Sequence, residues 1–553
     1  MVPIKSILNF GGFKGYELDG EVWKEVSLLK KNGAVCKKEN NRFLWYLNGS
    51  PQESTPNTDT DFGFKGSLFR FQKRHLSRLL SLDRGLLAID TGLGKTVEMS
   101  SLLQYLYFNG AKLPSLVIVP KSIIPNWVRE LETHTNLTYG LTSRLKFKSK
   151  NDRLVEFNDA QVKIINYTQL RINKENIIDL KYETVIFDEA NFIKNIKTDT
   201  AKQAYKLNAK RKYLLTATPI KNSPLEIYSL ARALDCSQYL FGSYNEYLNT
   251  YAEMRQVPFS PVPISVGYRN LDMLKSKIKP FSIFESKNNP DIINEIGQSF
   301  KFEIKVLQID IKPEQKKILD YISSEMERLL RQVGKSFNSS EELIPKELSE
   351  YREKMLAYYT IARMVGCSVK TYLSSNSELK IGFPPVDSVS LSPKISEIIR
   401  IINDETEQNE KVVIYTSFIS FSKEIENSLN EAGINTLSAS GADNYLSLIE
   451  RFKSDNNIKA LVITGIGKYG INLQNSQYLI FADMPFTYNE VEQLIGRVVR
   501  IGQGGIPIIY FLLSGIIDNK IYSSIMMKRE YNRFDTTYSS FIDTANSAEH
   551  LPK

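Results

Sequence analysis

Residues 84–108 read RGLLAIDTGLGKTVEMSSLLQYLYF. The other motifs in the sequence are interpreted by their relation to this stretch. The apolar run Leu86–Ile89 predicts a buried strand, and apolar residues three and four apart after Lys95 predict a helix. The loop between them, Asp90–Gly94, contains two glycines. A strand, a glycine-rich loop and a helix start can bind a phosphate group, because backbone N–H groups and the positive end of the helix converge there.

The residues of this loop have separate predicted roles. Lys95 can reach the terminal phosphates of a nucleotide, and the Thr96 hydroxyl is placed to bind Mg²⁺. The strict glycine pattern requires a glycine where this chain has Ile89, which leaves a structural glycine turn as the alternative. Backbone contacts with phosphate are predicted for Thr91, Gly92, Leu93 and Gly94.

The composition is typical of a globular protein. The 553 residues are 42% hydrophobic and 24% charged, with a formal net charge of +9. This charge permits a polyanionic partner, although many basic proteins bind no nucleic acid. Three well-separated cysteines and three histidines indicate neither a zinc site nor a disulfide framework. The N-terminus lacks a signal-peptide pattern and the longest apolar run, residues 506–517, is too short for a membrane span. We therefore expect a soluble, membrane-free protein, cytoplasmic or, in a eukaryote, nuclear.

Four regions are predicted along the chain. Residues 1–60 form a small module, and residues 61–300 form an α/β lobe with an irregular, partly helical insertion from about residue 235. Residues 301–400 are predicted to be a helical linking region, and residues 401–553 a second α/β lobe with a polar tail. Alternating strand and helix patterns predict parallel sheets in both lobes. The predicted strands are Leu86–Ile89, Leu116–Val119, Val162–Ile165, Thr184–Phe187, Tyr213–Leu215, Val412–Tyr415, Ala460–Ile463, Tyr478–Phe481 and Ile508–Leu513.

Two carboxylates follow the buried run Val185–Phe187. Nucleotide hydrolysis needs one carboxylate that holds Mg²⁺ and a neighbour that orients the attacking water. Asp188 and Glu189 fit these roles at the carboxyl end of a strand, where ligands bind in parallel sheets. Without the Lys95 loop upstream, such a pair would be interpreted as the start of a solvated loop.

Two arginines lie near the end of the chain, in QLIGRVVR at residues 493–500. Their spacing predicts that Arg497 and Arg500 share one face of a helix. An ATPase with a second lobe can use such arginines to stabilise the charge that develops on the γ-phosphate. The alternative is a pair of ordinary surface arginines.

Across residues 64–530 the chain resembles the Swi/Snf-type DNA translocases of helicase superfamily two. Similar segments follow one another in the family's order: Phe69–Gln72 (FRFQ), Asp90–Thr96 (DTGLGKT), Leu116–Trp127 (LVIVPKSIIPNW), Ile164–Tyr167 (IINY), Asp188–Asn195 (DEANFIKN), Leu215–Asn222 (LTATPIKN), Lys411–Phe418 (KVVIYTSF), Gly470–Leu473 (GINL), Arg497–Gln503 (RVVRIGQ) and Gly515–Tyr522 (GIIDNKIY). The chain departs from the family pattern at Asn191 and Val499, where the family has histidines, and at residues 280–285 and 483–488. Contacts that couple the lobes are therefore in doubt.

The resemblance implies two RecA-like lobes that use ATP and Mg²⁺ and bind double-stranded or branched DNA. Gln72 would read adenine, and Gly470 and Gln493 would complete the nucleotide site. Thr216 and Thr218 would relay the nucleotide state between the lobes, with a strand-end cap as the alternative. Contacts with DNA phosphates are implied for Lys121, Ser122, Asn166, Tyr167, Lys468 and Asn472, each of which could instead be a solvated loop residue.

The N-terminal module resembles, more weakly, the HARP-type module of fork-remodelling annealing enzymes. A helix is predicted at residues 22–29, followed by a hairpin over residues 33–46 that turns at Asn40–Asn41. Aromatic and basic side chains alternate in this hairpin and suit DNA binding, although a structural β-rich unit explains them equally well. Trp127, in the first lobe, is interpreted as a packing residue.

The sequence leads to a principal hypothesis of an ATP-dependent double-stranded DNA translocase acting as a monomer. It would remodel branched DNA or displace bound proteins. The alternatives are a strand-separating helicase of replication or recombination, and an ATP-gated clamp or scaffold without turnover. The presence of Lys95, Asp188, Glu189 and both arginines argues against the scaffold, because a protein without turnover needs none of them.

Overall fold

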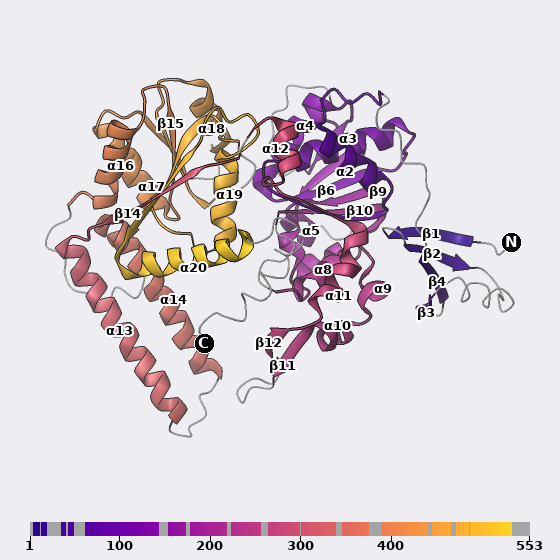
Figure 1. Ribbon diagram of the computed structural model, residues 1–553, viewed down its shortest axis with the longest axis horizontal. Helices are drawn as coiled ribbons and strands as arrows, with labels where there is room; N and C mark the ends of the chain where they lie inside the picture. The colour runs from indigo at the N-terminus through magenta and orange to yellow at the C-terminus, as the bar shows by residue number, and fades with distance from the viewer. Residues whose placement is uncertain are drawn as a thin grey trace. The chain divides into compact units, whose positions relative to one another are not determined.

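The computed structural model describes residues 4–10, 13–18, 35–39, 42–48, 61–142, 153–172, 177–217, 223–255, 264–298, 300–338, 345–374, 390–440, 445–465, 472–485 and 487–533. These residues divide into two compact units: the first contains the described residues up to 297 together with residues 531–533, and the second contains residues 298–530 (Figure 1). None of the helices in these ranges combines the length and apolar character that a bilayer crossing requires.

The N-terminal residues of the first unit contain a four-stranded antiparallel sheet. Its strands are β1 (Ile4–Phe10), β2 (Phe13–Leu18), β3 (Val35–Glu39) and β4 (Arg42–Asn48), in the order β1-β2-β4-β3. The pairing of Glu39 with Arg42 confirms the predicted hairpin. The helix predicted at residues 22–29 lies outside the described residues.

The main sheet of the first unit has seven parallel strands in the order β13-β5-β10-β9-β6-β8-β7. Its strands are β5 (Arg84–Ile89), β6 (Ser115–Val119), β7 (Tyr139–Leu141), β8 (Val162–Asn166), β9 (Lys181–Phe187), β10 (Asn208–Thr216) and β13 (Ser282–Glu285). A separate ribbon pairs β11 (Ala252–Arg255) with β12 (Ile264–Tyr268). The five strands predicted for this lobe are confirmed, and every residue of β5, β6 and β8 is buried, as expected for a parallel sheet covered on both faces.

Helices cover both faces of this sheet. Figure 1 shows α3 and α4 on one side and α5 and α8 on the other. The helices are α2 (Arg70–Leu80), α3 (Lys95–Phe108), η1 (Lys121–Ile123), α4 (Ile124–His134), α5 (Tyr167–Ile172), η2 (Ala190–Ile193), α7 (Asp199–Ala204), α8 (Glu226–Ala233), α9 (Ser237–Phe241), α10 (Tyr244–Tyr251), α11 (Leu271–Ile278), η3 (Lys279–Phe281) and α12 (Pro290–Ile296).

The second unit is built on a six-stranded parallel sheet in the order β14-β19-β18-β15-β17-β16. Its strands are β14 (Glu303–Ile309), β15 (Lys411–Tyr415), β16 (Thr436–Ala439), β17 (Ala460–Ile463), β18 (Ser476–Phe481) and β19 (Ile508–Ser514). The four strands predicted for the second lobe are confirmed. The two sheets together confirm the predicted α/β fold class.

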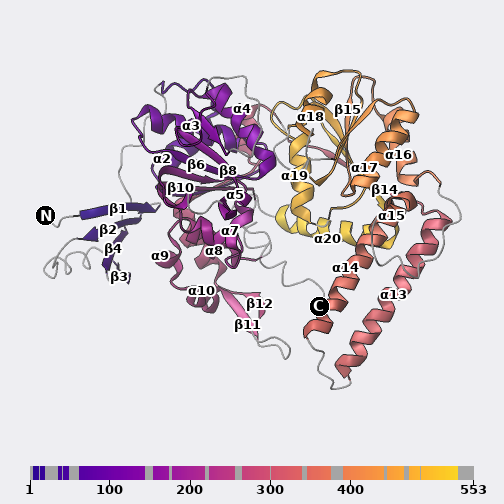
Figure 2. The same cartoon turned by 180° about the vertical axis from the view of Figure 1, so that it is seen from behind.

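Two long helices of the second unit, α13 and α14, extend side by side away from its sheet (Figure 2). The helices of this unit are α13 (Pro313–Asn338), α14 (Pro345–Cys367), α15 (Val369–Leu373), α16 (Pro393–Glu405), α17 (Ile419–Glu431), α18 (Tyr445–Ser454), α19 (Tyr488–Val498) and α20 (Gly515–Arg533).

Two edge strands differ from what the sequence predicted. β13 lies in the segment expected to be irregular, and β14 opens the region expected to be helical. Among the described strands, each pairs with one neighbour only: β13 with β5, and β14 with β19. β14 is half-exposed along its length, so its sequence lacks the continuous apolar run that identifies the central strands. The boundaries of the four predicted regions stay predictions.

Candidate active site

The loop between β5 and α3 has the backbone that its glycines predict. Gly92 and Gly94 adopt φ angles of 96° and 89°, a region that residues with a Cβ atom avoid. A Cβ atom at Gly94 would lie 2.5 Å from Nε2 of Gln72, so the position also lacks space for a side chain. The α3 helix begins directly after this loop, at Lys95. The predicted strand, loop and helix are therefore present.

Lys95 folds back over its own loop. Its ammonium donates hydrogen bonds to the carbonyl oxygens of Ile89, at 2.7 Å, and Asp90, at 3.2 Å. Asp90 is itself held, because its carboxylate accepts hydrogen bonds from the Ser286 hydroxyl and the Lys287 N–H. The loop is thus tied at its start to the segment that follows β13.

Gln72 joins the start of α2 to the same loop. Its side-chain oxygen accepts a hydrogen bond from the Phe69 N–H at 3.0 Å, and its Nε2 donates to the Leu93 carbonyl at 3.0 Å. Gln72 therefore caps α2 and fixes the loop. Its reading of adenine stays a prediction.

A buried charge cluster that the sequence did not predict lies between α2, α3 and β13. His75 Nδ1 lies 3.3 Å from the Glu98 carboxylate, and its Nε2 lies 3.7 Å from Glu285. Burial lowers the pKa of His75, but hydrogen bonds and charge interactions with Glu285 and Glu98 outweigh it and raise the pKa to about 9. Burial raises the pKa of Glu98. The cluster therefore holds three secondary-structure elements together behind the loop.

Asp188 and Glu189 form a tight turn at the carboxyl end of β9. Both side chains are buried, and Glu189 adopts a φ angle of 51°, which is uncommon for a residue with a side chain. One Asp188 oxygen accepts a hydrogen bond from the Glu189 N–H at 2.9 Å, and the other accepts from the Trp127 indole at 2.8 Å. Both carboxylate oxygens are thus oriented by the protein.

Asn191 connects this turn to the end of β10. Its Nδ2 donates to Glu189 Oε2 at 3.4 Å, and its Oδ1 accepts from the Thr216 hydroxyl at 3.5 Å. Asn191 stands where the family that the sequence resembles has a histidine. It therefore bridges Glu189, a predicted catalytic residue, and Thr216, a predicted coupling residue. Thr218 lies outside the described residues.

Two residues expected to contact DNA have partners within the first unit. Tyr167 is buried, donates its hydroxyl to the Asp188 carbonyl at 2.7 Å and stacks on Phe192. Asn166 caps α5, because its Oδ1 accepts from the Gln169 N–H at 2.9 Å. The expected contact of the Tyr167 side chain with DNA does not agree with this burial. Tyr167 supports the Asp188–Glu189 turn.

The other residues predicted to contact DNA differ in their exposure and in their partners. Lys121 is exposed and Ser122 half-buried in η1, directly before α4. In the second unit, Asn472 accepts a hydrogen bond from the Arg500 guanidinium, and its expected contact with DNA stays a prediction. Lys468 and Gly470 lie outside the described residues.

The two arginines do not share a helix face as predicted. The α19 helix ends at Val498, so Arg497 lies in its last turn and Arg500 lies beyond it. Val499, the capping residue, leaves helical geometry with ψ 87°, so Arg500 does not continue the helix that contains Arg497. The Arg500 carbonyl accepts a hydrogen bond from Gln298 Nε2 at 2.9 Å. Gln493, earlier on α19, is buried, and within the described residues its Oε1 has no hydrogen-bond partner.

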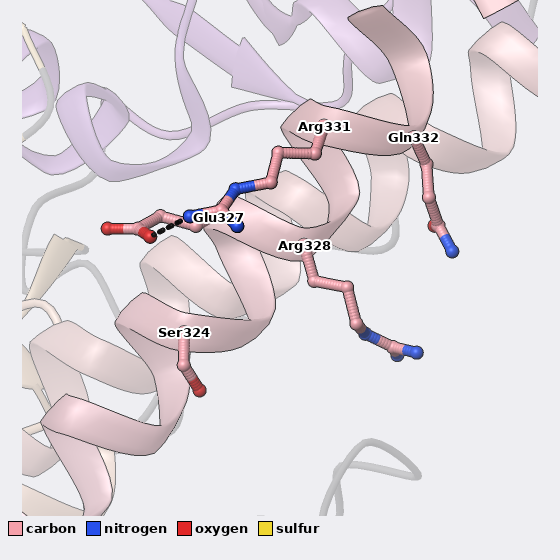
Figure 3. Close-up of a pocket in the computed structure, with 5 residues that line it drawn as sticks. All are labelled: Ser324, Glu327, Arg328, Arg331 and Gln332. Atoms are coloured by element: carbon pink, nitrogen blue, oxygen red, sulfur yellow. Dashed lines mark hydrogen bonds and ion pairs between the residues drawn. The ribbon is translucent and has the colours of Figure 1, made fainter. Parts of the chain in front are cut away.

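A surface hollow on α13 is a poor alternative to this site. Its five lining residues all belong to that one helix, and their side chains point in different directions (Figure 3): Ser324, Glu327, Arg328, Arg331 and Gln332. An exposed ion pair joins Arg331 to Glu327 at 3.3 Å, and such pairs contribute little stability. No convergent set of catalytic groups forms in this hollow.

Three functional candidates escaped the sequence prediction: His75, Asn126 and the hydrogen-bonding role of Trp127. His75 and Trp127 contact residues from distant parts of the chain, so no local pattern marks these contacts. For Asn126 and Trp127, the available signal was their position just after the strand and turn at residues 116–123.

Comparison with known proteins identifies the family of the chain. The family model of the SNF2-related domain matches residues 46–349, and that of the helicase conserved C-terminal domain matches residues 393–502. An uncharacterized ATP-dependent helicase of Bacillus subtilis, YqhH, is 25% identical over 76% of this chain and 70% of its own length. The DNA excision repair protein ERCC-6-like of Danio rerio is 25% identical over 84% of this chain, which spans 36% of that relative. The putative helicase/translocase YwqA of Bacillus subtilis is 24% identical over 87% of this chain and 50% of its own length.

Solved structures of helicase cores are also similar. The SWI2/SNF2 ATPase core of Sulfolobus solfataricus in complex with dsDNA is 24% identical, with coverage of 88% of this chain and 97% of that chain and a TM-score of 0.39. The Hef helicase domain of Pyrococcus furiosus is 16% identical, with coverage of 83% and 98% and a TM-score of 0.47. The SNF2-related match alone spans more than half of the 553 residues. The chain therefore belongs to the SNF2 family of ATP-dependent helicases and translocases, a family of DNA-dependent ATPases with two RecA-like lobes.

Proposed function

We propose that this chain is an ATP-dependent double-stranded DNA translocase that remodels branched DNA or displaces bound proteins. The observation that supports this function best is the carboxyl edge of the first unit's sheet. Thr96, directly after the phosphate loop, and Asp188, directly after β9, both contact α4. A phosphate loop and a carboxylate turn that meet at this edge are the parts that nucleotide hydrolysis requires.

The donors at this edge fit Mg²⁺. The Thr96 hydroxyl and the Asp188 carboxylate are hard oxygen ligands, and Mg²⁺ is commonly held by one or two protein groups, with phosphate and water oxygens completing its shell. When bound, the ion neutralises charge on the β- and γ-phosphates. We assign Thr96 and Asp188 as its protein ligands.

The chain's own groups perform the remaining steps. Lys95 exchanges its bonds to the loop carbonyls for bonds to phosphate oxygens. Glu189 orients a water whose oxygen bonds to the γ-phosphorus, and accepts its proton while the bond to the bridging oxygen breaks, giving ADP and phosphate. Arg497 and Arg500 stabilise the charge on the transferred group.

DNA is the proposed partner because the chain is basic, with a net charge of +9, and belongs to this family. Lys121 and Ser122 in η1 are assigned to phosphate contacts, as is Lys468 outside the described residues. Phosphate contacts carry no base sequence information, so binding should be salt-sensitive and independent of sequence.

The test is ATP turnover with duplex, forked and single-stranded DNA and with RNA. We expect stimulation by duplex or forked DNA, and no stimulation by any nucleic acid would overturn the proposal. Displacement of a triplex strand without duplex unwinding supports a translocase, whereas unwinding supports a strand-separating helicase. The variant Lys95→Ala should lose hydrolysis and keep salt-sensitive DNA binding. Equal loss of both would show that the loop is structural.

A further inference from the structure

Two consecutive residues of α4 each contact one of the two proposed Mg²⁺ ligands. Asn126 Nδ2 donates to the Thr96 hydroxyl at 3.4 Å, and the Trp127 indole N–H donates to Asp188 Oδ2 at 2.8 Å. Thr96 and Asp188 are far apart in sequence, on α3 and after β9. The first turn of α4 therefore bridges the two elements that supply the proposed ligands.

The contact with Asp188 is made away from water. Trp127 is fully buried and Asp188 is 4% exposed. An indole N–H only donates, and a buried N–H is normally paired, so the ring and the carboxylate fix each other's orientation. The other Asp188 oxygen accepts the Glu189 N–H. The carboxylate is consequently held from two sides.

We propose that Asn126 and Trp127 are positioning residues that hold Thr96 and Asp188 in the geometry that binds Mg²⁺ with ATP. The inference rests on the proposed function. Groups that hydrogen-bond to metal ligands orient them, and their mutation typically weakens metal affinity or activity about 10- to 100-fold. Trp127 thus packs in the core, as the sequence predicted, and also orients a ligand.

A matched pair of variants separates positioning from packing. Trp127→Phe keeps an aromatic ring in the core and removes the hydrogen bond to Asp188. Tyr139→Phe is the control, because it removes a different, partly buried hydrogen bond, from the hydroxyl of the buried Tyr139 to Glu132 on α4. Thermal unfolding of both variants checks that the first unit remains folded.

The measurement is the affinity of the full chain for a fluorescent ATP analogue, with Mg²⁺ and with EDTA. The Kd measured with EDTA divided by the Kd measured with Mg²⁺ reports how strongly the metal contributes to nucleotide binding. We expect Trp127→Phe to reduce this ratio about 10-fold and Tyr139→Phe to leave it unchanged. A wild-type ratio in Trp127→Phe would overturn this inference alone. A wild-type chain that binds no ATP would overturn the proposed function as well.

Two further variants test the route of the effect. In the double variant Trp127→Phe/Asp188→Asn, the ratio should fall no further than in Asp188→Asn, because both changes act through one carboxylate. Independent losses would contradict the inference. If Trp127→Phe does not fold, Asn126→Ala decides, because it keeps the indole ring and removes the longer contact with Thr96. A reduction of a few-fold supports the proposal, and an unchanged ratio refutes it.

Discussion

The two parallel sheets of this chain use their carboxyl edges differently. At the first edge, Asp188 accepts hydrogen bonds from an indole and a backbone N–H, and Lys95 donates to two carbonyl oxygens. At the second edge, Asp483 follows β18 and forms a fully buried ion pair with Arg363 of α14 at 2.6 Å. Lys394 of α16 forms another with Asp518 of α20 at 2.7 Å.

The buried pairs of the second edge tie its helices to neighbouring strands. Asp483 also accepts the N–H of Ser417, after β15, at 2.7 Å. Lys394 donates to the Ala482 carbonyl, next to β18, at 2.9 Å. A charge already neutralised by a buried partner is poorly placed to bind a ligand. The first edge is therefore suited to chemistry, and the second edge anchors α14 and α16 to the sheet.

Glu189→Gln should have the largest effect and should act on activity rather than folding. The amide keeps the shape of the side chain but cannot accept a proton, so we expect ATP turnover to fall by roughly 10²- to 10⁴-fold. Steady-state phosphate release with duplex DNA measures this loss. DNA binding should persist, and turnover lost with DNA binding retained would exclude the ATP-gated clamp without turnover. Normal turnover in the variant would remove Glu189 from the catalytic assignment.

Arg363→Met should lower the stability of the second unit, in contrast to Glu189→Gln, which lowers turnover. It leaves Asp483 buried without its cation, which typically destabilises a protein by about 3–5 kcal/mol. Chemical unfolding of the second unit should shift to lower denaturant concentration.

The matched control is the double variant Arg363→Met/Asp483→Leu, which removes both charges. It should recover much of the lost stability, since an apolar pair can replace a buried ion pair. Equal stability of wild type and Arg363→Met would show that the second edge is no structural junction.

His75→Gln tests whether the first unit also contains a structural charge cluster, set behind its loop. The folded pKa of His75, about 9, exceeds its ordinary value of 6.5, so the protonated form favours folding. This stability is fully present below pH 6.5 and is lost as the pH rises through 9. The shift corresponds to roughly 2–3 kcal/mol at neutral pH.

Thermal unfolding between pH 6 and 9.5 measures this contribution. The wild type should lose stability over that range, and His75→Gln should show a smaller loss from a lower starting value. His134→Gln serves as control, because its ring is partly exposed beside Glu130. Parallel pH profiles for wild type and His75→Gln would contradict the assigned role of the cluster.

The predictable part of the site is the part with local sequence signals. Continuous apolar runs identified β5 and β9, and Gly92 and Gly94 marked the loop. The pairing of Arg363 with Asp483 joins residues far apart in sequence, and no local pattern shows that the two residues pair. The same holds for Trp127 and Asp188. The edge strands β13 and β14 escaped because short or half-exposed strands lack a strong apolar pattern.

Asn191→Ala should give the smallest effect and sharpens the description of the first edge. It removes the bridge from Glu189 to Thr216, whose two contacts are long, at 3.4 and 3.5 Å. A hydrogen bond contributes about 0.5–1.5 kcal/mol, and one to a charged carboxylate up to about 3 kcal/mol. Because both contacts are long, we expect the lower range, so turnover should fall by roughly 2- to 10-fold. Single-turnover hydrolysis with saturating ATP isolates this step.

Thr216→Val provides the comparison for Asn191→Ala, because it removes the far end of the same bridge and keeps Asn191 beside Glu189. If the bridge acts as a unit, the double variant should be no slower than the more impaired single variant. Multiplying losses would mean that Asn191 and Thr216 act separately. In that case Glu189 would be held by separate contacts at the first edge. At the second edge, by contrast, ion pairs and hydrogen bonds share the same side chains.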